Sequence, residues 1–317
     1  MATTQETAKT LYLTANNIKF AYRIIGPEKS SKPPILFLNH YRSNIDLWDP
    51  LVVNGIAAAG RQVITYDYGG VGHSGGDCEL SVKAFSANAI AFLKELLPTL
   101  AGSPKQVDLL GFSLGGYVVQ QLTIDMPEIV NRIVISGSGL SGTASSWTAV
   151  RPMAEVQSAI SAEPADGQAI ADAFFPSFIN TKDASQGWLG RIFSGRAQIA
   201  GKDGEPEFRN FLHGPQLQRL TEAYLKWDGD TTTNALLQTI QKDTLVTAGS
   251  NDLIVPTQNA YALSRQIPRA NFVVYPGSGH GHLFQYSDFY VKQVNSFLDG
   301  EWPSPPSYGA IRGQLGV

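Results

Sequence analysis

Short runs of apolar, largely β-branched residues alternate along the chain with segments in which apolar residues recur every three or four positions. The short runs, which predict strands, span residues 18–25, 35–38, 62–66, 106–110, 132–136, 244–247 and 271–275. The segments with helical spacing span residues 50–59, 82–97, 114–125, 257–267 and 289–298. Because this alternation is typical of βαβ units, we expect an α/β fold with a mostly parallel central sheet, helices on both faces and an antiparallel edge formed by the first strands.

One long stretch, residues 141–233, breaks the alternation because it contains no clear strand signal. Amphipathic pieces at residues 154–160, 167–175 and 216–226 predict helices within it. We therefore predict a core made of residues 1–140 and 234–300, a helical cap made of residues 141–233, and a loose C-terminal tail made of residues 301–317.

The predicted cap is rich in aromatic side chains, which either line a pocket beneath it or hold it onto the core. The leading candidates for a substrate pocket are Trp147, Phe175 and Trp188. The other aromatic candidates are Phe174, Phe178, Phe193, Tyr224 and Trp227.

Composition narrows the class of protein. The 317 residues are 43% hydrophobic and 16% charged with a net charge of -3, and the basic residues are dispersed, which argues against a nucleic-acid partner. Neither a secretory signal nor an apolar run of about 18 residues is visible, so we expect no membrane partner. The single cysteine, Cys78, excludes an intrachain disulfide and a Cys-rich zinc site. These features favour a soluble cytoplasmic protein with a small-molecule substrate, and a homodimer is left open.

The most informative motif is Gly-Phe-Ser-Leu-Gly-Gly at residues 111–116, between a predicted strand and a predicted helix. A sharp strand-to-helix turn lifts a serine hydroxyl above the sheet edge, where a base can take its proton, and glycines on either side allow the turn to be tight. The following helix directs backbone N–H groups at the reacting oxygen. Ser113 is therefore the candidate nucleophile.

Five histidines are available as the base: His40, His73, His213, His280 and His282. Two of them, His280 and His282, lie in the glycine-rich loop after the predicted strand at 271–275, on the same side of a parallel sheet as Ser113. We assign the base to His280, at the loop apex between two glycines, and keep His282 as the reserve candidate. A metal site is disfavoured, since the pair would need distant carboxylates to complete it, and we expect no metal.

The base needs an acid to orient it. Asp252 lies in the loop after the predicted strand at 244–247, where the active sites of open α/β sheets gather. The loop after the strand at 132–136 contains no acid. We therefore assign the acid to Asp252.

The order Ser113, Asp252, His280 along the chain resembles that of the α/β-hydrolase superfamily, and the resemblance covers residues 10 to 300. It implies the α/β-hydrolase fold, with the helical cap inserted after the sixth strand, and a reaction that uses no cofactor.

The resemblance also points to the loop Asn39-His40-Tyr41-Arg42-Ser43-Asn44, where the superfamily carries His-Gly before an oxyanion residue. Tyr41 replaces that glycine here. The resemblance implies that the backbone N–H of Arg42, or of Tyr41, joins that of Leu114 to form the oxyanion hole. His40 is expected to support the loop. A further hypothesis is that the Arg42 guanidinium binds a carboxylate or carbonyl of the substrate. The alternative is that it forms a structural salt bridge.

Residues 70–75, Gly-Val-Gly-His-Ser-Gly, match the spacing of a dinucleotide-binding fingerprint. No helix opens within the motif, and Glu95, at the distance of the ribose-binding acid, falls inside a predicted helix. The stretch is instead similar to the Asp-x-x-Gly-x-Gly-x-Ser turn of many α/β-hydrolases, so we expect no nucleotide cofactor and take His73 as a loop residue.

Together these residues predict a serine-dependent hydrolase that cleaves a carboxylic ester or lactone of a small to medium apolar substrate through an acyl-enzyme. Hydrolysis of a carbon–carbon bond and cofactor-free haloperoxidase-like chemistry are alternatives within the fold. A non-hydrolytic ligand-binding or biosynthetic member of the fold is the alternative from another class.

Overall fold

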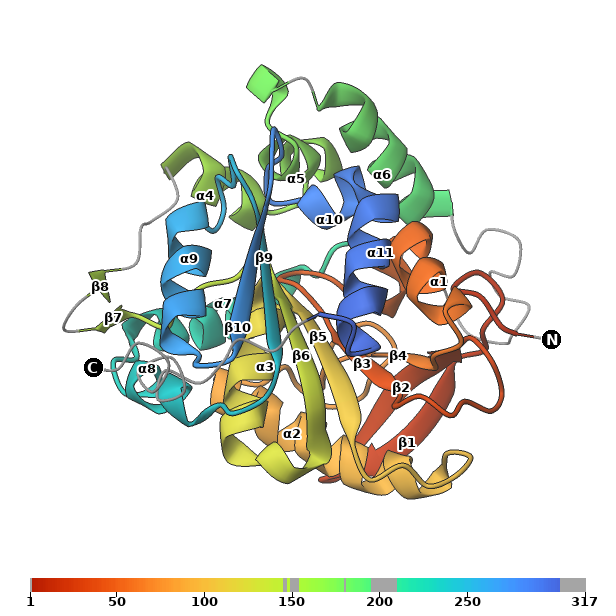
Figure 1. The fold of residues 1–317 in the computed structure, drawn as a ribbon. Helices are drawn as coiled ribbons and strands as arrows, with labels where there is room; N and C mark the ends of the chain where they lie inside the picture. The colour runs from red at the N-terminus through yellow and green to blue at the C-terminus, as the bar shows by residue number, and fades with distance from the viewer. Residues whose placement is uncertain (1, 145–146, 149–153, 180, 195–209, 303–317) are drawn as a thin grey trace, which may run out of the picture.

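The computed structural model describes residues 2–144, 147–148, 154–179, 181–194 and 210–302. At its centre is an eight-stranded sheet with the order β1-β2-β4-β3-β5-β6-β9-β10 (Figure 1). The strands are β1 (Leu11–Ala15), β2 (Ile18–Ile25), β3 (Ile35–Leu38), β4 (Val63–Tyr66), β5 (Val107–Phe112), β6 (Val130–Ser136), β9 (Thr244–Gly249) and β10 (Ala270–Tyr275). β1 pairs antiparallel with β2 and β2 with β4, and the remaining pairs are parallel, which confirms the expected sheet with its antiparallel edge.

The strand β1 is absent from the sequence prediction. It is a short edge strand with several exposed positions, so its apolar pattern is weak. Asn16 and Asn17 connect it to β2 with positive φ angles of 47° and 60°. Two consecutive positive φ angles are typical of a type I′ hairpin turn, in which asparagine is favoured. The turn chemistry therefore marks this strand better than its hydrophobic pattern does.

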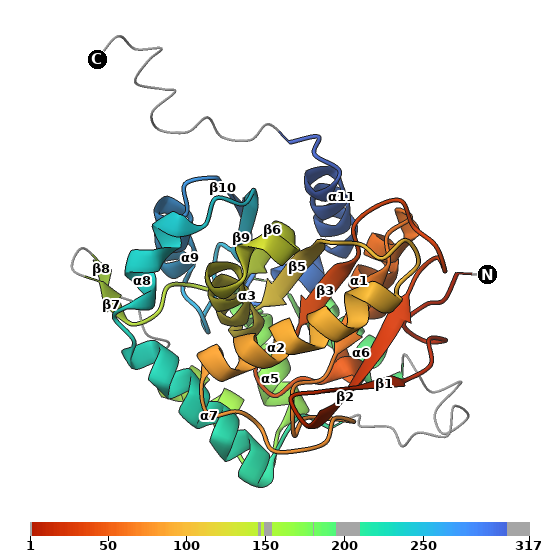
Figure 2. The ribbon, with the colours of Figure 1, turned by 90° about the horizontal axis from the view of Figure 1, so that it is seen from below.

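Helices cover both faces of the sheet (Figure 2). α2 (Val82–Leu96), α3 (Leu114–Asp125) and α9 (Thr257–Gln266) contribute to one apolar cluster, and α1 (Pro50–Ala58) and α11 (Ser287–Leu298) contribute to the other. α1 begins as its sequence predicts, because Asp49 accepts a hydrogen bond from the Leu51 N–H and Pro50 occupies the first turn. The helices that follow β3 and β5 thus hold the carboxyl ends of these strands in fixed positions.

Between β6 and β9 the chain forms β7 (Thr143–Ala144), β8 (Trp147–Thr148), α4 (Ala154–Ser161), α5 (Gly167–Phe174), α6 (Lys182–Ser194) and α7 (Gly214–Gly229). Figure 1 shows α4, α5 and α6 above the sheet. α6 was not predicted, because only Ser185, Trp188 and Ile192 on it are buried, too few for a clear apolar stripe. The division into core and cap remains a prediction.

The other short helices are α8 (Thr233–Leu236), α10 (His282–Gln285) and the 3₁₀ turns Ile45–Leu47, Leu97–Thr99, Pro127–Ile129, Ser177–Ile179 and Leu237–Thr239. Most of the predicted loose tail lies outside the described residues.

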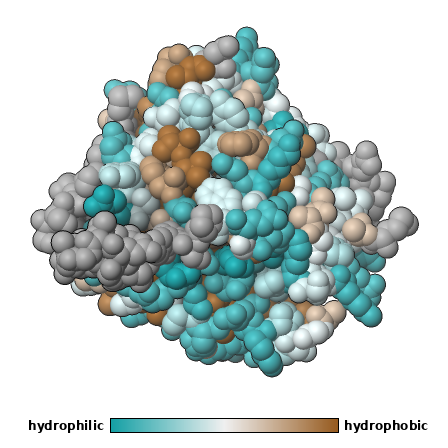
Figure 3. All heavy atoms as spheres, viewed as in Figure 1, coloured by the Kyte–Doolittle hydropathy of each residue, from teal (hydrophilic) through white to brown (hydrophobic). Residues whose placement is uncertain are grey.

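The face in Figure 3 is mainly hydrophilic, with hydrophobic patches in its upper half. Within the described part of the chain, each helix is too short or too polar to cross a membrane.

Candidate active site

Ser113 occupies a strained turn between β5 and α3. Its φ of 54° and ψ of −119° lie outside the regions that non-glycine residues ordinarily adopt, and its N–H donates to the Ser136 carbonyl at 2.9 Å. A Cβ on Gly111 would lie 2.3 Å from the Gly115 carbonyl oxygen, and one on Gly115 would lie 2.1 Å from the Leu38 carbonyl oxygen. The glycines of the motif are therefore required because α3 begins in close contact with β3 and β5.

Asp252 and His280 form a buried pair beyond the ends of β9 and β10. His280 Nδ1 donates to Asp252 Oδ2 at 2.7 Å, and both side chains are at most 1% exposed. The other carboxylate oxygen, Asp252 Oδ1, accepts from the N–H groups of Ile254 and Val255, each at 2.9 Å. Three donors therefore hold the carboxylate, and the bond to Nδ1 leaves His280 Nε2 to exchange a proton with a reactant.

The reserve candidate, His282, faces away from Asp252. Its Nδ1 donates to the His280 carbonyl at 3.2 Å, and its Nε2 lies 2.9 Å from the Thr247 hydroxyl. The ring packs against Tyr275 and Tyr290, and the residue is fully buried. Burial, and then the charge of His280, lowers the pKa of His282 to about 3. His282 is therefore neutral at physiological pH and is placed as a structural residue.

His282 makes the stability of the protein depend on pH. Its pKa is about 6.5 in an unfolded chain and about 3 here, so only the unfolded state takes up this proton between those values, and stability is lost as pH falls through that window. His40, whose burial also lowers its pKa to about 3, acts with the same sign. Asp67 acts in the opposite direction, because burial raises its pKa to about 7. Its contribution to the stability of the folded state is complete at low pH and is lost as pH rises towards 7.

We therefore expect His282→Gln to flatten the dependence of the unfolding free energy on pH between 4 and 6.5. One proton corresponds to a slope of about 1.4 kcal/mol per pH unit, and the variant should lose roughly that slope relative to the parent. Urea unfolding at a series of pH values measures the two curves. Parallel curves would contradict the assigned shift.

The loop after β3 brings its residues into contact with the cap. Arg42 has a φ of 67° and is 1% exposed. Its guanidinium donates to the carbonyls of Leu212, Ile160 and Ala162 at 2.9–3.0 Å and to Glu163 Oε1 at 3.3 Å. These donors are engaged with the protein itself, which argues against a substrate carboxylate as the partner of Arg42 and favours the structural alternative.

The neighbouring residues of this loop have distinct roles. His40 is buried, and its Nδ1 donates to the Tyr41 carbonyl at 2.9 Å, as expected for a residue that supports the loop. The Tyr41 hydroxyl lies 2.6 Å from the Thr221 hydroxyl of α7. The Tyr41 side chain therefore links this loop to α7. In the described part of the chain the backbone N–H groups of Arg42 and Leu114 have no hydrogen-bond acceptor, so both are available to an oxyanion.

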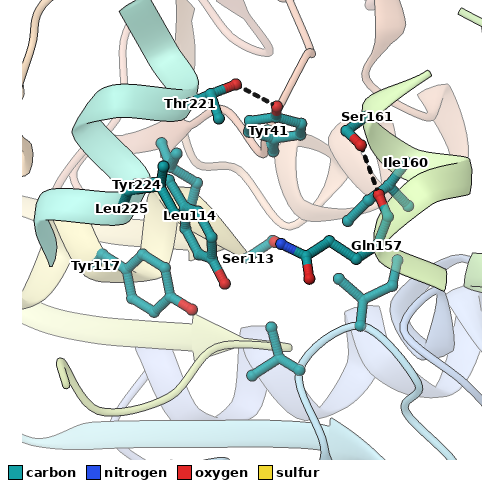
Figure 4. A pocket seen from close by; sticks show the side chains of 12 residues that line it. Tyr41, Ser113, Leu114, Tyr117, Gln157, Ile160, Ser161, Thr221, Tyr224 and Leu225 are labelled. Carbon is teal, nitrogen blue, oxygen red and sulfur yellow. Dashed lines mark hydrogen bonds between the residues drawn. The ribbon is translucent and has the colours of Figure 1, made fainter. Parts of the chain in front are cut away.

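A cavity of about 170 Å³ opens beside Ser113 (Figure 4). It is lined by Tyr41, Ser113, Leu114, Tyr117, Gln157, Ile160, Ser161, Thr221, Tyr224, Leu225, Ile254 and Val255. In Figure 4 the side chains of Tyr117, Tyr224 and Gln157 extend towards the space around Ser113. The rings of Tyr117 and Tyr224 are stacked, with an interplanar angle of 25°. Apolar surface and a few hydroxyl and amide groups are typical of a small-molecule site.

A second, smaller cavity of about 20 Å³ joins the reactive groups. His40, Arg42, Ser113, Phe174 and His280 are among its lining residues. Among the described contacts no hydrogen bond connects Ser113 and His280, so proton transfer requires these two side chains to come within hydrogen-bond reach.

The structure places the predicted pocket aromatics differently from the sequence analysis. Trp188 and Phe175 are buried and pack against each other with ring centroids 5.6 Å apart, and neither is among the described residues that line the two cavities at Ser113. Trp188 also stacks on Phe284 of α10. Trp188 therefore links α6 to α10, and Phe175 packs beside it. Tyr224 and Phe174, from the wider set, do line the cavities. The side chain of Trp147 lies outside the described residues.

Sequence reasoning missed most of the pocket. Tyr117, Gln157, Ile254 and Val255 come from four separate segments and share no local motif. Position was the available signal: Tyr117 lies one helical turn after Ser113, so its side chain shares a face with the start of α3.

The segment at residues 70–75 forms a turn, as expected. Gly72 has a φ of 54°, and a Cβ there would lie 2.3 Å from Asp67 Oδ2. That carboxylate oxygen accepts from the His73 N–H at 2.9 Å, and Glu95 lies inside α2. The glycines thus shape a carboxylate-centred turn. Across the described residues no group of three or more His, Cys, Asp or Glu side chains is arranged to hold a metal ion.

The chain is similar to known proteins over most of its length. The family model described as alpha/beta hydrolase fold matches residues 33–285. The proline iminopeptidase PfmaB of Pestalotiopsis fici is 22% identical over 91% of this chain and 99% of its own length. The 2-hydroxymuconate semialdehyde hydrolase of Pseudomonas sp. strain CF600 is 26% identical over 76% of this chain and 77% of its own length.

Among solved structures, the alpha/beta hydrolase fold protein from Chitinophaga pinensis is similar throughout. It has a TM-score of 0.75 and 28% sequence identity, and the match covers 93% of this chain and 99% of that one.

Proposed function

The chain belongs to the α/β-hydrolase fold family and is a hydrolase, and we propose that Ser113 is its nucleophile, His280 its general acid and base, and Asp252 the residue that orients His280. One observation carries the proposal: the strained Ser113 turn and His280 line the same cavity, and the Asp252 carboxylate accepts a hydrogen bond from the His280 ring. This combination supplies a nucleophile, a base and an orienting acid in the order that serine hydrolases require.

Acylation begins when Ser113 Oγ attacks a substrate carbonyl carbon and its proton passes to His280 Nε2. The carbonyl oxygen becomes an oxyanion, which the backbone N–H groups of Leu114 and Arg42 stabilise, with the Tyr41 N–H as the alternative to that of Arg42. The bond to the leaving group then breaks, and His280 donates the proton to the departing oxygen. Asp252 holds the Nδ1 proton throughout and stabilises the imidazolium.

Deacylation repeats these steps with water. His280 Nε2 accepts a proton from water as the water oxygen bonds to the acyl carbon. The second tetrahedral intermediate collapses, the ester bond to Ser113 breaks, and the proton on His280 returns to Ser113 Oγ.

We propose a carboxylic ester or lactone of a small to medium apolar molecule as the substrate. The cavity beside Ser113 is lined mainly by apolar and aromatic side chains. At about 170 Å³ it is similar in size to an apolar cavity of about 150 Å³ that holds benzene.

Hydrolysis of a carbon–carbon bond is the second candidate. The similarity to an enzyme named 2-hydroxymuconate semialdehyde hydrolase favours it. The same nucleophile and oxyanion hole would serve either reaction.

A cytoplasmic location fits the buried single cysteine, because burial raises the pKa of its thiol to about 12.

The proposal is tested by labelling with a fluorophosphonate probe, followed by a substrate panel. The probe should modify the native protein at Ser113 and leave Ser113→Ala unmodified, because only an activated serine attacks phosphorus at a useful rate. The panel compares p-nitrophenyl esters and lactones of increasing size with diketones that report carbon–carbon cleavage. A folded native protein that takes no label would refute the serine-hydrolase proposal.

A further inference from the structure

The loop that carries the first oxyanion donor is bound to the cap from two sides. Both the side chain and the backbone of Arg42 make these contacts. The guanidinium makes four hydrogen bonds to residues 160–163 and 212, and the Arg42 carbonyl accepts from the Leu212 N–H at 2.8 Å. Two residues further on, Asn44 Nδ2 donates to the Asn210 carbonyl at 3.2 Å. The loop and the cap therefore cannot shift independently.

The backbone of Arg42 needs this support. Its φ of 67° lies in the left-handed region, which a long side chain rarely adopts unless surrounding contacts hold it there. The Arg42 side chain is 2% exposed, and its one anionic partner among the described residues is Glu163, which is itself 46% exposed. Its other acceptors are three backbone carbonyls of the cap. Any displacement of these cap residues would leave buried donors unpaired, so the cap fixes the conformation of residue 42.

We propose that Arg42 is a positioning residue. The hydrogen bonds of its guanidinium to the cap hold the Arg42 backbone in the conformation in which its N–H completes the oxyanion hole. The inference rests on the proposed serine-hydrolase function. It predicts that the oxyanion hole is complete only when the segments at 160–163 and 210–212 are seated on the loop. Of the described residues that line the cavity beside Ser113, Ile160 is the one that the Arg42 guanidinium bonds to, through its backbone carbonyl. Loosening this contact leaves the other walls in place, so it should affect the transition state more than the ground state.

Arg42→Lys is the direct test, because an ammonium group lacks the planar set of donors needed to reach these acceptors. We expect kcat to fall about 100-fold, as for loss of one oxyanion donor, with KM unchanged within about threefold. The hydrolysis of a p-nitrophenyl ester measures both. Arg191→Lys is the matched control: Arg191 of α6 also joins cap to core, through Asp49 at 2.7 Å, but does not contact the loop.

Two inhibitors separate positioning from general loosening. Ser113 Oγ bonds to the carbonyl carbon of a short-chain trifluoromethyl ketone, and the serine proton passes to His280. The ketone oxygen becomes an oxyanion in the oxyanion hole, whereas the corresponding trifluoromethyl alcohol forms no oxyanion. In Arg42→Lys the inhibition constant of the ketone should rise about 100-fold and that of the alcohol should not change. Arg191→Lys should change neither.

The outcomes are distinct. A folded Arg42→Lys with kcat within twofold of the parent, or with both inhibitors weakened equally, would overturn the inference. If Arg42→Lys does not fold, Glu163→Ala decides: a rise of threefold or more in the ketone-to-alcohol ratio supports positioning, and an unchanged ratio overturns it. A native protein that neither turns over esters nor binds the ketone would instead remove the proposed function.

Discussion

Replacing His280 with alanine is expected to lower kcat by about five to six orders of magnitude, the scale seen when one member of a serine triad is removed. Without the imidazole, Ser113 attacks as a neutral hydroxyl and the leaving group departs unprotonated. KM should change little, because the cavity beside Ser113 is formed mainly by other residues. Steady-state hydrolysis of a p-nitrophenyl ester, at a protein concentration determined from absorbance, measures the loss.

His282→Gln is the matched control, since it changes the other histidine of the same loop. His282 contacts Thr247 and the His280 carbonyl and is buried away from Asp252, so its replacement should lower kcat less than about tenfold. The opposite pattern, with activity retained in His280→Ala and abolished in His282→Gln, would transfer the base to His282.

Asp252→Asn is expected to lower kcat by about 10⁴, with KM nearly unchanged. The amide can keep the two hydrogen bonds from the Ile254 and Val255 N–H groups through its oxygen, so the loop should fold normally. Its NH₂ group then faces His280 Nδ1, which must act as an acceptor, and the ring proton moves to Nε2. In that tautomer Nε2 cannot accept the Ser113 proton.

The same measurement on Asp299→Asn provides the control for removing a carboxylate that takes part in salt bridges. Asp299 pairs with Arg61 and Lys32 at the end of α11, and it lies outside the residues that line the cavities at Ser113. We expect a change in stability there and kcat within twofold. An Asp252→Asn protein that retains more than a tenth of parental activity would exclude the orienting role.

The sheet and the three proposed triad positions could be predicted because each depends on local pattern. Apolar runs marked seven of the strands in the main sheet, and Leu114–Asp125 was predicted with the bounds that α3 has. Since parallel strands end at the same edge of a sheet, loops after β5, β9 and β10 had to bring Ser113, Asp252 and His280 together. Of the elements that were missed, β1 and α6 have few buried positions and so a weak pattern, and β7, β8, α8 and α10 are two to four residues long.

Local sequence distinguishes the two loop histidines less clearly than it marks the strands. His280 and His282 share one glycine-rich segment, and either could in principle have faced Asp252. The difference comes from packing: the Phe112 and Phe174 rings hold His280 beside Ser113, whereas Thr247 and Tyr290 enclose His282.

The sequence alone determined which residues we propose as nucleophile, acid and base, because Ser113, Asp252 and His280 each follow a strand in a loop encoded by a few neighbouring residues. The tertiary structure decided what surrounds them. It buried Trp188 and Phe175, placed Tyr117, Gln157 and Tyr224 around the cavity, and bonded the Arg42 guanidinium to the Leu212 carbonyl. Arg42 and Leu212 lie far apart in the sequence, and a hydrophobic pattern records that a side chain is buried without recording its partner.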